Sequence, residues 1–176
     1  DQLFGGLYGA LIVEGDPVPV SRERTLIVSD ISLTAGGDIA EASADDIMMG
    51  REGDLVLVNG QVRPQLKARP GERERWRIVN ACTSRYLRLA VPGQRVDLLG
   101  IDGGREPTAR EVQEVLLAPG NRADLLVTMR TGTSELRTLG YHRGGMGMMM
   151  GGATLSGPAT LALVSVTGDE VATLGP

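Results

Sequence analysis

The sequence contains few of the residues that build thiol and metal chemistry. It has one cysteine, Cys82, and one histidine, His142, among 176 residues. A single cysteine excludes an intramolecular disulfide bond, and the cellular compartment cannot be inferred from it. A trigonal copper site takes two histidines and one cysteine, so this chain cannot supply one by itself. Neither a Cys-x-x-Cys nor a His-x-x-x-His spacing occurs, which argues against a zinc site.

Motifs of the common enzyme classes are also missing. There is no Gly-x-Ser-x-Gly elbow and no P-loop, and the only histidine leaves little choice of catalytic base. Cys82 follows an expected strand and has no histidine near it in sequence, so we interpret it as a small, partly buried core residue. Asp102 precedes two glycines and is interpreted as a turn former. We therefore predict no catalytic residue in this chain.

Long apolar runs and a basic charge balance are absent as well. No run approaches the roughly 18 residues of a membrane span, and the net charge of −4 gives no reason to expect nucleic acid. The arginine-rich stretch 63–88 also contains Glu72 and Glu74, and we interpret it, acidic residues included, as the solvated face of strands. Neither a membrane nor a nucleic acid is expected as a partner.

What the sequence does have is a series of short apolar runs separated by turn residues. The runs are partly alternating and rich in Val, Ile and Leu, as strands are. Asn59-Gly60 is expected to close a two-residue hairpin. Helix is nearly absent: one short turn is expected near 38–49, capped by Asp38. This pattern predicts an all-β sandwich or barrel. The expected strands are 7–13, 25–31, 54–60, 75–81, 85–91, 95–101, 114–118, 123–129 and 160–166.

Several phrases, taken in order, resemble the three-domain multicopper oxidases. The stretch "QLFGGLYGALIVEG" (2–15) is similar to the end of the first cupredoxin domain of that family. The core of the second domain resembles "LVNGQVRPQLKARPGERERWRIVNACTSRYLRLAV" (57–91), and "GIDGG" (100–104) and "LLAPGNRADLLV" (116–127) continue in the same order. The resemblance covers nearly the whole chain and implies a cupredoxin-like Greek-key β-sandwich with little helix.

The resemblance also implies a function for the parent protein. Enzymes of the family oxidise phenols or metal ions and reduce dioxygen to water, and their copper ligands belong to the first and third domains. We therefore expect this chain to be the structural, non-catalytic middle domain, with copper a cofactor of the parent only. Two alternatives remain open: a copper-free scaffold or binding protein of the same fold, and a methionine-rich module that binds Cu(I).

The expected organisation follows from the same resemblance. Residues 1–14 are interpreted as the closing strand of a preceding cupredoxin domain, 15–24 as a linker, 25–168 as the middle domain and 169–176 as a tail or linker. The expected partners are the first and third cupredoxin domains of the parent. We also expect self-association through exposed inter-domain surface, and a secreted, periplasmic or cell-envelope location.

One motif stands apart, the segment "HRGGMGMMMGG" (142–152). Thioethers and imidazole suit Cu(I), and the glycines allow the backbone to bend around an ion. The Cu(I) candidates are Met146, Met148, Met149 and His142. Methionine also fills irregular apolar gaps well, so packing at a domain junction is the competing interpretation. The sequence favours packing, with an auxiliary Cu(I) contact as the alternative.

Overall fold

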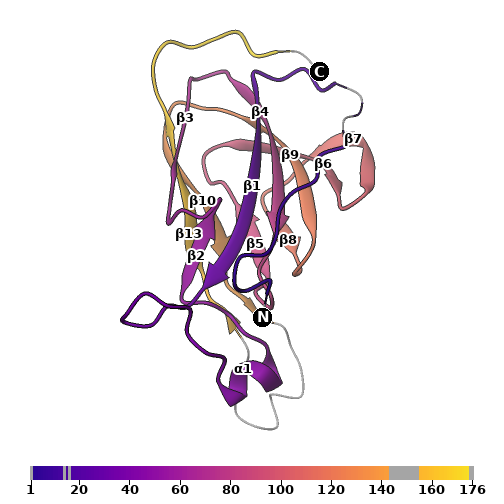
Figure 1. Ribbon diagram of the computed structural model, residues 1–176. Helices are drawn as coiled ribbons and strands as arrows, with labels where there is room; N and C mark the ends of the chain where they lie inside the picture. The colour runs from indigo at the N-terminus through magenta and orange to yellow at the C-terminus, as the bar shows by residue number, and fades with distance from the viewer. Residues whose placement is uncertain (1, 14, 16, 143–154, 175–176) are drawn as a thin grey trace.

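The computed structural model describes residues 2–13, 15, 17–142 and 155–174, and it confirms an all-β fold (Figure 1). Within these residues two main sheets pack face to face. One has the strand order β2-β1-β4-β9-β6-β7 and the other β3-β13-β10-β5-β8. The first sheet contains β1 (Arg22–Ile31), β2 (Leu55–Val58), β4 (Arg73–Asn80), β6 (Arg95–Ile101), β7 (Gly104–Glu111) and β9 (Arg122–Thr128). The second contains β3 (Gln65–Ala68), β5 (Leu87–Ala90), β8 (Val115–Leu117), β10 (Gly132–Leu139) and β13 (Ala159–Val166).

Each sheet is mixed, because one pair of strands in each runs parallel. β1 pairs with β4 in parallel, with Leu26 opposite Ile78, and β13 pairs with β3 in parallel, with Val164 opposite Leu66. A parallel pair needs a crossover connection rather than a tight hairpin. Neighbouring strands are therefore often far apart in sequence. β11 (Tyr141–His142) and β12 (Leu155–Ser156) form a small antiparallel hairpin that is separate from the two main sheets.

The core lies between the two sheets and follows the two-residue period of the strands. In β4, Trp76 and Ile78 are fully buried, whereas Arg75 and Arg77 on the opposite face are partly exposed. From the second sheet, Leu136 is also fully buried. Alternation of this kind places one face of a strand in the core and the other at the surface.

Most of the expected strands are present, and the exceptions have clear physical reasons. β7 is missing from the expected set because "GREPTARE" is polar and lies exposed at a sheet edge, where no apolar alternation is required. Residues 7–13 were expected as a strand, but they form none within the described part of the chain. A strand needs a neighbouring strand to pair with, and no described strand pairs with this segment.

The turn and helix predictions had different outcomes. Asn59 and Gly60 both have positive φ, and Val58 and Gln61 exchange backbone hydrogen bonds of 2.9 and 3.0 Å, which confirms the two-residue turn. The single described helix, α1 (Ala44–Met49), is capped by Ser43, so the expected Asp38 cap is wrong. Ser43 and Asp46 form a reciprocal capping box, which satisfies the first free N–H groups more effectively. No helix in the described ranges is long and apolar enough to cross a membrane.

Candidate functional site

His142 is the one candidate metal ligand of the sequence that the structure places. It is exposed on β11, opposite Leu155 of β12. Met146, Met148 and Met149 lie outside the described residues. The structure therefore describes the first residue of the methionine segment, His142, which pairs with Leu155 of β12.

The base of this hairpin is anchored to the sandwich by side chains. The ring of Tyr141 stacks on that of Tyr86, with 5.0 Å between centroids. The buried Ser156 hydroxyl donates to Glu52 at 2.7 Å and accepts from the backbone N–H of Tyr86 at 3.1 Å. Position 142 is thus held at a defined place on one end of the fold.

Glu52 is also part of a buried charge cluster that sequence reasoning missed. Arg85 donates from Nε to Asp30 at 3.0 Å, and its guanidinium lies 3.5 Å from Glu52. Asp30 also accepts from the backbone N–H of Gly53 at 2.8 Å, while its Oδ1 has no hydrogen-bond partner. Residues 30, 52 and 85 are far apart in the sequence and form no motif, so only the folded chain brings them together.

The interpretation of stretch 63–88 as a solvated face therefore needs correction. Glu74 is fully buried, accepts from Trp76 Nε1 at 2.8 Å and forms a 2.6 Å ion pair with Arg24. Glu72 and Arg85 are buried too. Glu74 lies on the same face of β4 as Trp76, because two residues separate them, and that face is the inner one.

Cys82 behaves as the small core residue that the sequence predicts. It is free and 1% exposed. Burial, and next the nearby negative charge of Asp30, raise the pKa of its thiol far above the ordinary value. A thiol that stays protonated is a poor nucleophile and a poor metal ligand. Its position therefore suits packing and not chemistry.

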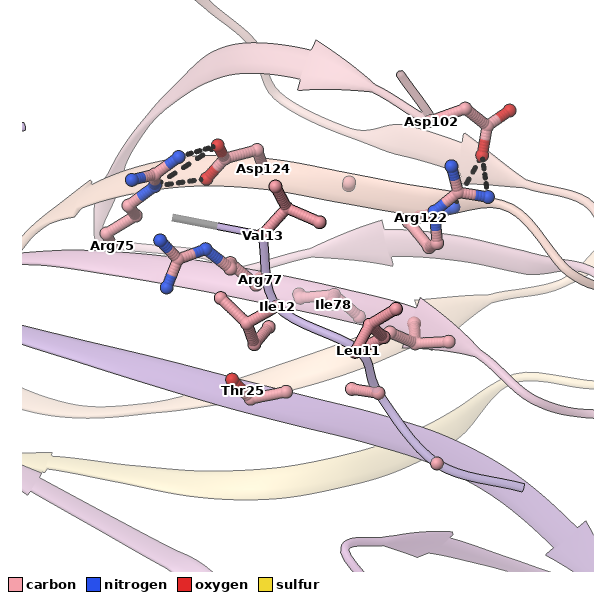
Figure 2. Close-up of a pocket in the computed structure, with 14 residues that line it drawn as sticks. Leu11, Ile12, Val13, Thr25, Arg75, Arg77, Ile78, Asp102, Arg122 and Asp124 are labelled. Carbon is pink, nitrogen blue, oxygen red and sulfur yellow. Dashed lines mark hydrogen bonds and ion pairs between the residues drawn. The ribbon is translucent and has the colours of Figure 1, made fainter. Parts of the chain in front are cut away.

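A surface cavity of about 420 Å³ lies on the outer face of the first sheet, beside the segment Gly9–Val13 (Figure 2). The charged side chains that line it are all in ion pairs: Arg77 pairs with Glu23, which lies outside the lining, and the other four pair with each other. Arg75 makes a bidentate contact to Asp124, with distances down to 2.5 Å, and Arg122 lies 3.2 Å from Asp102. These pairs leave little free charge to bind an anion. Asp102 itself has φ 54° and accepts from the backbone N–H of Arg122, which confirms its role in a turn.

Metal-binding geometry is absent from the described part of the chain. No group of three or more His, Cys, Asp or Glu side chains there is placed to hold a metal ion. Cys82 is buried beside Asp30, whereas His142 is exposed on the β11–β12 hairpin. The two donors that a blue-copper site needs together are therefore in different environments, and the donor set of this chain does not fit such a site.

Comparison with known proteins gives a consistent result. The multicopper oxidase family model matches residues 22–135. A multicopper oxidase mco from Staphylococcus haemolyticus is 36% identical over 135 residues, covering 73% of this chain and 30% of the relative. The laccase of Bacillus subtilis is 28% identical over 144 residues, covering 72% of this chain and 28% of its own. Cell division protein FtsP of Salmonella typhimurium is 31% identical over 150 residues, covering 79% and 31%.

Solved structures agree in fold. A multicopper oxidase from Pseudomonas thermotolerans superposes with a TM-score of 0.79 at 26% identity, covering 99% of this chain and 40% of that one. A multicopper oxidase from Campylobacter jejuni, described as a metallo-oxidase, has a TM-score of 0.71 at 30% identity, covering 85% and 31%. These similarities confirm the cupredoxin-like fold. The chain spans about 30% of the length of the curated relatives it matches.

Proposed function

The chain belongs to the multicopper oxidase family, and on that premise we propose that it is the structural middle domain of a copper-dependent oxidase. In the parent, copper supplies electron transfer from a phenol or a metal ion to dioxygen. The residues of this chain hold the neighbouring first and third domains in register. The observation that carries the proposal is the state of the only cysteine. Its thiol is buried and its pKa is raised, so it does not suit the role of a thiolate ligand to copper.

The N-terminal segment supports the organisation expected from the sequence. Phe4 is 4% exposed, with the Arg51 guanidinium 3.6 Å from its ring centroid, and the Tyr8 hydroxyl donates to Ser29 at 2.6 Å. In contrast, Leu11 and Val13 are 90% and 83% exposed. An apolar segment without a strand partner suits a closing strand of a preceding domain. The proposed organisation is residues 1–14 as that strand, 15–24 as a linker whose last three residues already belong to β1, 25–168 as the middle domain and 169–176 as a tail or linker.

Cys82→Ala in the full-length polypeptide that contains these residues tests whether Cys82 is a copper ligand. We expect the variant to keep its copper content and the intense visible absorption of thiolate-bound copper, because the ligating cysteine lies in another domain. Circular dichroism would establish that the variant is folded. Loss of the visible band from a folded Cys82→Ala variant would contradict the proposal.

A copper-free scaffold is the second candidate, and the similarity to FtsP, a relative named as a cell division protein and not as an oxidase, favours it. The two candidates differ in one measurement on the full-length polypeptide. The oxidase binds copper in stoichiometric amounts and consumes dioxygen with a phenol or cuprous substrate. A scaffold that folds normally and binds no copper would replace the oxidase proposal.

The methionine segment carries a further proposal, an auxiliary Cu(I) contact made by Met146, Met148, Met149 and His142. The exposure of His142 at the start of this segment supports it. Cu(I) titration with a competing chelator would detect the site, and leucine at all three methionine positions would remove it. A titration curve unchanged in that triple variant would leave packing as the role of the segment.

Two further properties are proposed, one of the parent from the family resemblance and one of this chain from its exposed apolar residues. One is a secreted, periplasmic or cell-envelope location, which cell fractionation tests. The other is self-association of this chain through Leu11, Val13 and similar exposed apolar residues when the neighbouring domains are absent. Sedimentation that gives a strict monomer at high concentration would rule out self-association.

A further inference from the structure

The connection between β1 and β2 forms an ordered projection that contributes nothing to the core. We call residues 32–50 the β1–β2 excursion; it includes α1 and lies beyond one end of the sandwich (Figure 1). None of its residues is buried. Its order comes from polar contacts: Ala40 N–H donates to Ser32 at 2.9 Å, Ser43 and Asp46 cap α1, and Arg51 donates to the Ala40 carbonyl.

Such a projection exposes apolar side chains to an unusual degree. In α1, Ile47 is 76% exposed and Met48 80% exposed, and Met49 is 46% exposed. Leu33 and Ile39, which are bridged to each other, are each 45% exposed. A six-residue helix is too short to be stable by itself. Fixing a short helix by caps while its apolar side chains face solvent is typical of a surface that a partner covers.

The charges of the excursion restrict what that partner can be. Four acidic residues, Asp38, Glu41, Asp45 and Asp46, lie in 32–50, and no lysine or arginine does. Of these four, only Asp46 has a side chain that stabilises the excursion, as part of the capping box. The complementary surface is therefore an apolar centre with lysine or arginine around it.

The structure also indicates that the partner belongs to the same polypeptide. Arg51 joins the excursion to the N-terminal segment, because it donates to Ala40 and lies against the Phe4 ring. Arg51 thus links the excursion to the segment assigned to a neighbouring domain. The curated relatives are also about three times as long as the part that this chain matches, since the match covers about 30% of them.

We propose that the β1–β2 excursion is the docking surface for a neighbouring domain of the same polypeptide, which meets α1 with a basic-rimmed apolar face. This inference rests on the proposed function. Beyond that function, it specifies which residues of this chain make the contact and the chemistry of the surface that the neighbouring domain presents. Ile47 and Met48 form the apolar part of the contact, and Asp38 and Asp45 form its charged rim.

Methionine oxidation tests the inference in the full-length polypeptide. Dilute hydrogen peroxide followed by peptide mass spectrometry gives the rate at which Met48 becomes a sulfoxide. The fast reference is a methionine in an unstructured peptide, and the slow reference is Met129, which is 2% exposed. If a domain covers α1, Met48 is oxidised at least about ten-fold more slowly than the unstructured reference, despite its exposure in this chain.

Substitutions test the chemistry of the partner. Ile47→Asp and the charge reversal Asp45→Lys are each expected to raise the oxidation rate of Met48 several-fold. Val62→Asp is the matched control, because Val62 is an apolar residue 52% exposed outside the excursion. It is expected to leave the rate unchanged. An equal effect of Val62→Asp would overturn the assignment, because it would reflect general loosening of the fold.

The remaining outcomes separate other occupants from the one proposed. Oxidation of Met48 at the unstructured rate would mean that nothing covers α1. Protection that disappears on dilution would assign the surface to a second copy of the chain, and protection that requires anionic vesicles would assign it to a membrane. Each of these outcomes overturns the inference. A polypeptide with full copper content and an unprotected Met48 would refute the inference while leaving the proposed function intact.

Discussion

Arg85 pairs with two acidic side chains, the buried Asp30 and the partly buried Glu52. Asp30 has no exposed side-chain surface, so its charge is compensated entirely by Arg85 and by the Gly53 backbone N–H. Removal of one partner from a buried charge cluster leaves the others uncompensated, which costs more than the cluster contributes as a whole. The cluster therefore acts mainly by specifying one arrangement of β1, β5 and the residues before β2.

Replacement of Arg85 tests this role. Arg85→Met is expected to lower the free energy of unfolding by about 3–5 kcal/mol, because the buried Asp30 carboxylate and the partly buried Glu52 carboxylate lose their counter-charge. Urea unfolding followed by tryptophan fluorescence gives the value. The matched control is Arg88→Met, three residues further along in β5, whose exposed pair with Glu114 is expected to contribute nothing measurable. Equal losses in the two variants would contradict a special role for the buried cluster.

Cys82 gives a second prediction at this scale. Because burial raises the pKa of its thiol well beyond the usual range, almost no thiolate exists near pH 8 in the folded protein. We expect no reaction with a chromogenic disulfide reagent over hours under native conditions, and one equivalent of thiol after denaturation in urea. Rapid native labelling would show that the thiol is accessible.

The turn between β3 and β4 contains a carboxylate, Glu72, that makes the stability of the protein depend on pH. Glu72 accepts from the Arg69 backbone N–H at 3.0 Å and from its guanidinium at 3.1 Å. The backbone hydrogen bond is the main cause that lowers the pKa of Glu72 below its usual value of 4.5. A lowered pKa in the folded state means that the unfolded state binds more protons in the intervening pH range. Stability from Glu72 is therefore full above about pH 4.5 and is lost as the pH falls further.

Glu72→Gln checks this response. The variant is expected to be less stable than the parent near neutral pH, and the difference is expected to shrink as the pH falls below about 4.5. Urea midpoints across an acid pH series give both curves. Glu114→Gln, at an exposed ion pair, serves as the control. A gap between parent and Glu72→Gln that stays constant through the acid range would mean that the carboxylate is not the source.

Elements differ in how well the sequence predicts them. β4 and β9 are recognisable because their apolar residues must meet the core, and Asn59-Gly60 is recognisable because few residue pairs tolerate positive φ. β7 and β10 cannot be recognised from the sequence. β7 is a polar edge strand and β10 contains polar and apolar residues together, so both depend on pairing with neighbouring strands. In β4 the two-residue period places Glu74 on the inner face with Trp76, but only the pairing with Arg24, distant in sequence, makes a buried charge tolerable there.

For the whole molecule, the attachment of the N-terminal segment is the feature most open to test. Phe4→Ala removes the ring that lies against Arg51, so residues before β1 are expected to open from the sandwich. Hydrogen exchange at the Leu7 amide, which is bonded to the Gln2 carbonyl, is expected to speed up at least about ten-fold. Amides of β4 and β9 are expected to be unaffected.

Leu7→Ala is the control for this experiment, because Leu7 is 69% exposed and its side chain anchors little. If Phe4→Ala leaves exchange at Leu7 unchanged, the segment is held by contacts other than the aromatic one. If exchange also accelerates throughout the core, Phe4 is part of the fold's global stability and does not act as a local anchor.

Sequence by itself determined the all-β class, the positions of tight turns and the small number of histidine and cysteine residues that could ligate copper. Each of these follows from local chemistry: a two-residue alternation, a pair that accepts positive φ, or the count of one histidine and one cysteine. Tertiary structure decided the parallel pairing of β1 with β4, the burial of Glu74, and the meeting of Asp30, Glu52 and Arg85. Those features depend on residues distant along the chain. Whether a charge can be buried is settled only by which opposite charge the fold brings beside it.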